Sequence, residues 1–118
     1  MILLILACLG GRTEIITIED EGSLCWNSGG NLEIDFDQCR SSSCDSLLSS
    51  ECSAELFDGV LEVSGTASIE SQIGGTCTAD CGVTTAICEL PSIDDPDAVV
   101  VSYGGVDTVL SEIPDCWW

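Results

Sequence analysis

Nine cysteines in a chain of 118 residues constrain its fold more than any other feature. This density is typical of small exported domains held together by disulfides, whereas cytosolic proteins keep few cysteines and keep them reduced. A zinc site is the alternative, but the chain has no histidine. Its closest cysteine pairs, Cys39 with Cys44 and Cys77 with Cys81, also lack the C-x2-C spacing of common zinc sites. The sequence therefore predicts structural disulfides and an oxidising compartment.

An odd number of cysteines cannot all pair within one chain. We expect four disulfides among the eight cysteines of the body of the chain, and we assign the ninth, Cys8, a separate role. A bridge from Cys52 to Cys88 is our preferred pair, and a bridge from Cys25 to Cys116 is a second one to consider. The eight are Cys25, Cys39, Cys44, Cys52, Cys77, Cys81, Cys88 and Cys116.

The segment that contains Cys8 is a short apolar run, Met-Ile-Leu-Leu-Ile-Leu-Ala-Cys. It is too short to span a bilayer but has the length of the apolar part of a signal peptide. Its end resembles a bacterial lipobox, in which a small residue precedes the cysteine that receives the lipid. We therefore expect residues 1–11 to be a truncated signal and tether with lipid on Cys8, and residues 12–118 to be the folded domain. The alternative is a buried β segment with a free cysteine.

Short β-strands separated by turns dominate the rest of the chain. Asp58-Gly59 and Gly104-Gly105 are dipeptides that tolerate the positive φ angles of a two-residue hairpin turn. In the first hairpin, Leu56 should face Leu61, and Glu55 should face Glu62. The strand candidates are Thr13–Ile18, Leu32–Asp37, Ala54–Ser64, Val83–Leu90 and Ala98–Leu110.

No stretch of about a dozen residues has the apolar period of a helix. The one weak helical candidate is a single turn within Ser43–Leu56. Many short strands, glycine-rich turns and several disulfides predict an all-β fold, a small antiparallel β-sandwich of immunoglobulin-like size.

The charge of the chain excludes some partners. Its 21 acidic residues face only Arg12 and Arg40, which gives a formal net charge of −19. Such a polyanion repels nucleic acid and anionic lipid surfaces. We therefore expect no nucleic-acid partner and no membrane contact except the lipid anchor, and we regard most of the acidity as a solvated surface.

Two acidic clusters are candidate cation sites. Asp94, Asp95 and Asp97 lie in a proline-bounded loop where closely spaced oxygen ligands could collect Ca²⁺. Glu33, Asp35 and Asp37 alternate with apolar residues and should line the solvent face of one strand. No cofactor other than possible calcium is expected.

Catalysis is not expected from this composition. A serine or cysteine nucleophile needs a base, and histidine and lysine are both missing. With 21 acids, some carboxylate pair always lies at the separation that glycosidases use, so such a pair carries no information. The three tryptophans, Trp26, Trp117 and Trp118, could form an exposed patch for a sugar or protein, or cluster at one edge of a thin core.

Several cysteine-containing segments resemble cysteine-rich lipoproteins of predatory soil bacteria of the myxobacterial type, a group with no assigned activity. The resemblance covers most of the chain and implies an exported, lipid-anchored, β-rich domain. Together these features predict a cell-envelope binding or adhesion module with a protein or glycan partner, either anchored or secreted; the alternative is a structural envelope protein without a small ligand. The segments that carry the resemblance are Leu24-Cys25, Ile34–Cys44, Gly75–Gly82 and Ala86–Pro91.

Overall fold

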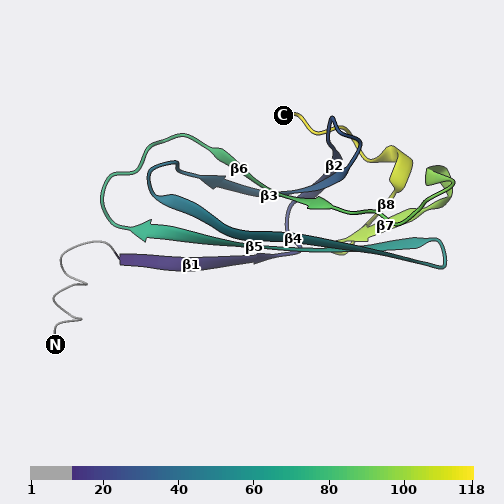
Figure 1. Ribbon diagram of the computed structural model, residues 1–118, viewed down its shortest axis with the longest axis horizontal. Helices are drawn as coiled ribbons and strands as arrows, with labels where there is room; N and C mark the ends of the chain where they lie inside the picture. Colours follow the sequence, from purple (N-terminus) through teal and green to yellow (C-terminus); the bar gives the residue numbers. More distant parts are fainter. Residues whose placement is uncertain (1–11) are drawn as a thin grey trace.

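The computed structural model describes residues 12–118, so the segment 1–11, including Cys8, lies outside the described residues. The chain forms two β-sheets, one of five strands and one of three. Figure 1 shows the smaller sheet lying over one face of the larger. The fold is all-β and disulfide-rich, as expected. The elements are β1 (Arg12–Glu19), β2 (Ser23–Trp26), β3 (Leu32–Arg40), β4 (Asp45–Phe57), β5 (Val60–Ile73), β6 (Gly82–Cys88), η1 (Pro96–Ala98), β7 (Val100–Tyr103), β8 (Val106–Val109) and η2 (Leu110–Glu112).

The 14-residue strand β5 organises the larger sheet. Strand β4 pairs with β5 along nearly its whole length, so the other edge of β5 is shared between two shorter partners. Strand β1 pairs antiparallel with the segment 66–73, and β7 pairs in parallel with the segment 60–62. This parallel β5–β7 pairing differs from the antiparallel sandwich that the sequence predicted.

Alternation along β5 separates the two faces of this sheet. Leu61, Val63, Ala67 and Ile69 are buried, while the residues between them are exposed or half-buried. Gly65 continues the buried row because a Cβ atom there would lie 2.1 Å from the Cδ1 atom of Ile34. The close approach of the two sheets at this point therefore depends on a residue without a side chain.

Both expected hairpins are present, and the first has the expected register. Leu56 lies opposite Leu61, and Glu55 lies opposite Glu62 with both side chains exposed to solvent. In the second hairpin Val101 lies opposite Thr108, and the turn residues Gly104 and Gly105 have positive φ angles.

The smaller sheet has the order β2-β3-β6 and closes the core. Leu32, Ile34 and Phe36 on β3 are fully buried, because they alternate toward the face that packs against β5. Ala86 and Cys88 on β6 join the same cluster.

Two expectations about secondary structure were wrong or incomplete. The weak helical turn within Ser43–Leu56 does not form, because this segment belongs to β4 and pairs with β5 from Asp45 onward. A register shift between Leu47 and Ser49 interrupts its alternation, which explains the weak strand signal. The short strand β2 was not expected at all. Residues 12–118 contain no helix long and apolar enough to cross a membrane.

The eight cysteines of this region form four disulfides, which indicate an oxidising extracellular or envelope location. The expected Cys52–Cys88 bridge joins the two sheets, and Cys25–Cys116 ties the C-terminal segment to β2. The remaining two, Cys39–Cys81 and Cys44–Cys77, lie side by side between the β3–β4 and β5–β6 connections.

Candidate binding site

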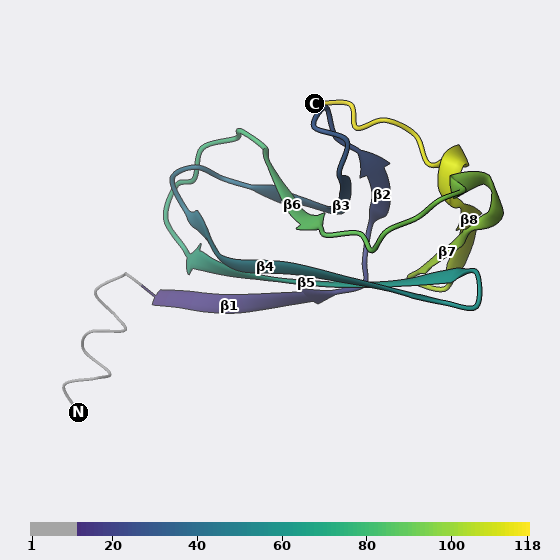
Figure 2. The same cartoon turned by 45° about the vertical axis from the view of Figure 1, so that its right-hand side comes forward.

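A pocket of about 490 Å³ opens between three separate parts of the chain. They are the β1–β2 connection, the β7–β8 hairpin and the segment at Ile113 and Pro114. Figure 2 shows the C-terminal segment running from the β7–β8 end of the sandwich toward β2. This volume lies within the range of small-ligand pockets in proteins.

The floor of the pocket is apolar and rigidly held. Val101, Tyr103 and Ile113 line it and are all buried members of the main core. Leu24 and Val106 line its walls, and the Val106 side chain is 65% exposed. At the floor, a ligand would contact side chains that are packed into the core.

Asp20 and Glu21 provide the acidic part of the lining. Asp20 adopts a left-handed backbone conformation, with φ of 49°. Its Oδ1 atom accepts hydrogen bonds from the Ser64 hydroxyl at 2.9 Å and from the Gly65 amide at 2.8 Å. These bonds anchor the β1–β2 connection to β5 and leave the other carboxylate oxygen without a bond to the described residues.

Gly22 allows this connection to pass close to the smaller sheet. It has φ of 82°, and a Cβ atom at this position would lie only 1.8 Å from the carbonyl oxygen of Asp35. No residue with a side chain fits there, so the course of the chain beside the pocket requires glycine.

Tyr103 links the floor of the pocket to its acidic rim. Its hydroxyl donates a hydrogen bond to the carbonyl oxygen of Glu21 at 2.5 Å. Burial, followed by the nearby carboxylates of Asp20 and Glu21, raises the pKa of the Tyr103 hydroxyl well above its usual range. The tyrosine therefore stays neutral beside these two acidic residues.

Neither arginine compensates this charge. Arg12 lies at the opposite end of β1, where it pairs with Ile73. Arg40 donates hydrogen bonds to the Thr84 hydroxyl at 3.1 Å and the Val83 carbonyl at 2.8 Å. Among residues 12–118, no basic residue lines the pocket.

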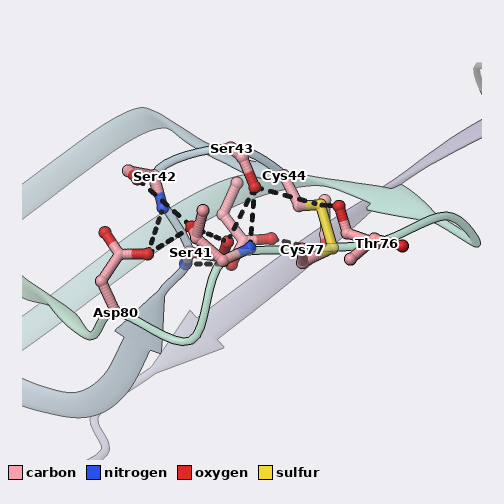
Figure 3. Close-up of a disulfide and its surroundings, with 10 residues drawn as sticks. Ser41, Ser42, Ser43, Cys44, Thr76, Cys77 and Asp80 are labelled. Atoms are coloured by element: carbon pink, nitrogen blue, oxygen red, sulfur yellow. Dashed lines mark hydrogen bonds between the residues drawn. A yellow bond between two sulfur atoms is a disulfide. The ribbon is translucent and has the colours of Figure 1, made fainter.

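A second polar cluster surrounds the paired disulfides at the other end of the sandwich (Figure 3). The hydroxyls of Ser41 and Ser42 share hydrogen bonds with Thr78 Oγ1, and the Thr78 amide donates to Ser43 Oγ at 2.9 Å. Thr78 Oγ1 and the Ser42 amide both donate to Asp80. These bonds join the two connections that the disulfides also join.

The carboxylate in this cluster is poorly suited to catalysis. The Thr78 and Ser42 donors hold the pKa of Asp80 below its usual value. Asp45, at the base of the same connection, has its pKa lowered by hydrogen bonds from Ser71 and Ser41 and by the charge of Arg40. A carboxylate that is harder to protonate is a weaker base toward a serine hydroxyl. The cluster fits a structural role in holding the two connections together.

The acidic loop expected to bind calcium is exposed. Asp95 Oδ1 accepts a hydrogen bond from the Asp97 amide at 3.1 Å and caps the short helix η1. Asp94, Asp95 and Asp97 do not form a ligand cluster, and no group of three or more potential metal ligands gathers within residues 12–118. Calcium binding at this loop stays a prediction.

The expectation that Glu33 points to solvent with Asp35 and Asp37 was wrong. Glu33 is only 7% exposed and accepts a hydrogen bond from Asn27 Nδ2 at 2.8 Å. It lies opposite Cys25, which is bonded to Cys116, so the C-terminal segment shields this part of the sheet.

The tryptophans divide between two environments. Trp26 is half-buried and packs against the core, whereas Trp117 and Trp118 are exposed. The latter two form an edge-to-face pair with ring centroids 5.4 Å apart.

Sequence reasoning missed the pocket. Its acids, Asp20 and Glu21, do not stand out from the other acids, because a turn glycine follows Asp58 as well. Nothing local indicates that Tyr103 and Ile113 will meet them, because distant pairing brings these segments together.

Comparisons with known proteins found no match to this chain. No protein-family model, no curated protein and no solved structure matches the chain.

Proposed function

We propose that the chain is a non-catalytic binding or adhesion module of a bacterial cell envelope, anchored by lipid on Cys8. The observation that carries this proposal is the pocket with an aliphatic floor and a carboxylate rim. Pockets of this kind, with a few polar groups on apolar walls, are the usual form of ligand sites. Four disulfides suit such a surface module because they stabilise a small core outside the cell.

The position of the pocket suits display from an N-terminal anchor. Strand β1 begins at Arg12, four positions after Cys8, and ends at Glu19, directly before the pocket. Eight residues of strand cover about 23 Å. An anchor near the start of β1 therefore leaves the pocket at the strand's far end.

The chemistry of the chain favours binding over catalysis. It contains no histidine or lysine to act as a base. Tyr103, the titratable residue in the pocket floor, keeps its proton because burial raises its pKa.

Two measurements test the proposal. Intact mass spectrometry of the native protein should show lipid on Cys8, and Cys8→Ser should release the protein to the soluble fraction. An unmodified N-terminus, or a disulfide from Cys8 to a second chain, would contradict a lipid anchor on Cys8.

Ligand binding is tested separately on glycan and peptide arrays with the oxidised full-length Cys8→Ser protein. Val106→Arg in the pocket wall should abolish binding, because the long cationic side chain can fill the acidic pocket itself, whereas Phe57→Arg, at an 81% exposed position outside the pocket, should not. Absence of any specific ligand, or equal loss in both variants, would favour a structural envelope protein.

A further inference from the structure

We infer that the pocket beside the β7–β8 hairpin binds a primary ammonium group carried on an aliphatic chain, the chemistry of a lysine side chain or a free alkylamine. This inference rests on the proposed binding function and names the ligand class of the same site. It follows from the shape of the pocket, its charge and the acceptors that remain open in it.

The shape of the pocket fits a narrow aliphatic stem. Leu24, Val101, Val106 and Ile113 contribute aliphatic groups, and Pro114 completes the wall. The one aromatic residue in the lining, Tyr103, is buried. A sugar that stacks on an exposed ring finds no such platform here, whereas methylene groups find apolar contacts on several sides.

The charge of the pocket selects a cation. Asp20 and Glu21 line it without a basic neighbour, in a chain with a formal net charge of −19. Field lines from like charges concentrate in a cleft with apolar walls and raise the local concentration of oppositely charged ligands. Anionic ligands are repelled for the same reason.

The acceptors favour an ammonium group over a guanidinium. Asp20 Oδ1 already accepts hydrogen bonds from Ser64 and Gly65, so this carboxylate cannot offer both oxygens to a planar fork. An ammonium group carries three donors that rotate freely. The open oxygen of Asp20 and the Glu21 carboxylate are the acceptors that remain for it.

A metal ion fits the site less well. Hard cations such as Ca²⁺ take six to eight oxygen ligands. No group of three potential ligands forms in the part of the chain that the structure describes, and aliphatic walls would displace the waters that complete a coordination shell. An ammonium group on an apolar stem would contact both the acidic residues and the aliphatic walls of the pocket.

The test is an NMR titration of the oxidised full-length Cys8→Ser protein with matched charged and neutral probes. The probes are n-pentylamine against n-pentanol, and acetyl-Gly-Lys-Gly-amide against the same peptide with norleucine. We expect saturable amide shifts at Leu24, Gly104 and Val106 with the two charged probes, and binding roughly tenfold weaker with the neutral ones. Tighter binding of the peptide identifies a protein lysine as the source; tighter binding of pentylamine identifies a free amine.

A matched pair of variants separates a local contact from the general field. Glu21→Gln should weaken ammonium binding roughly tenfold by removing one charged acceptor. Glu55→Gln makes the same charge change at an exposed position outside the pocket and should leave binding unchanged. An equal effect of both variants, equal binding of amine and alcohol, or no saturable shift with either charged probe would overturn the inference.

Failure of this inference is distinguishable from failure of the proposed function. A neutral array ligand that is lost in Val106→Arg would retain the pocket as a binding site while rejecting the ammonium. A pocket that binds neither array ligands nor amines would reject both.

Discussion

The two ends of the sandwich are held together in different ways. Around the pocket, Val101, Tyr103 and Ile113 belong to one buried cluster with strands β3 and β5. At the other end, none of the residues 37–47 or 70–83 is buried. Two disulfides and a network of serine, threonine and aspartate hydrogen bonds hold that end instead. Figure 3 shows the Cys44–Cys77 disulfide within this network.

This difference shows that a small chain can stabilise its two ends by different interactions. A domain of about this size buries a smaller fraction of its surface than a large one, so one core cannot reach both ends. Here the core lies beneath the candidate binding site, where a fixed floor preorganises ligand contacts. Crosslinks maintain the end where the connections are too polar to be buried.

Complete reduction of the four disulfides should destabilise the protein more than any single substitution. Each disulfide contributes about 2–4 kcal/mol, and the four together rival the total stability of about 5–15 kcal/mol of an ordinary domain. We expect the reduced protein to lose its cooperative thermal transition in circular dichroism. A reduced, alkylated protein that still melts cooperatively would show that neither end needs its crosslinks.

Truncation of a core side chain should come next. Phe36 is 1% exposed at the centre of the packed end, so Phe36→Ala should lower the free energy of unfolding by about 3–5 kcal/mol. Leu48→Ala, at the exposed register shift of β4, should change it by less than about 0.5 kcal/mol. Denaturant titration measures both, and similar losses would contradict the division into a packed and a crosslinked end.

Removing one disulfide at a time compares a bridge beside the core with a bridge at the crosslinked end. Cys52–Cys88 and Cys44–Cys77 span 36 and 33 residues, so loop-closure entropy assigns them almost the same contribution, about 3–4 kcal/mol. Cys88 is fully buried, whereas Cys77 is exposed. Replacing the first pair by alanines should therefore cost roughly 1 kcal/mol more than replacing the second, because it also leaves a gap in the core. Equal losses of stability would mean that both bridges act only by restricting the unfolded chain.

The smallest expected effect concerns Asp80 and pH. Its pKa is lowered in the folded protein, so its contribution to stability is full above the ordinary value of 3.8 and is lost as the pH falls through the lower folded value. Asp80→Asn should reduce the melting temperature slightly at pH 7, and the difference from the unchanged protein should vanish in stronger acid. A difference that persists at low pH would mean that the carboxylate charge is not its cause.

Local chemistry made much of the fold predictable. The Asp58-Gly59 turn determines the register of the β4–β5 hairpin, including the exposed Glu55 and Glu62 pair. The placement of Cys52 on the core face of the same hairpin was enough to suggest its bridge to Cys88. The remaining connectivity was not predictable, because spacing does not determine which cysteines pair.

The errors arose where distant contacts decide the structure. The serine-rich start of β4 has weak strand propensity, yet pairing with β5 makes it a strand. Glu33 follows the alternation of a solvent face, yet the Cys25–Cys116 bridge brings the C-terminal segment over it. The pocket also depends on distant contacts, because the β1–β2 connection, the β7–β8 hairpin and the C-terminal segment meet there. It therefore had no signature in the sequence.

Residue-resolved hydrogen exchange of the oxidised protein measures local stability at both ends at once. We expect amides of Leu61–Ile69, together with those of Val101 and Tyr103 beneath the pocket, to exchange only through global unfolding. Amides of residues 76–81 should exchange far faster, although two disulfides close this connection. Equal protection at both ends, or fast exchange at Val101 and Tyr103, would contradict a binding site built on the packed core.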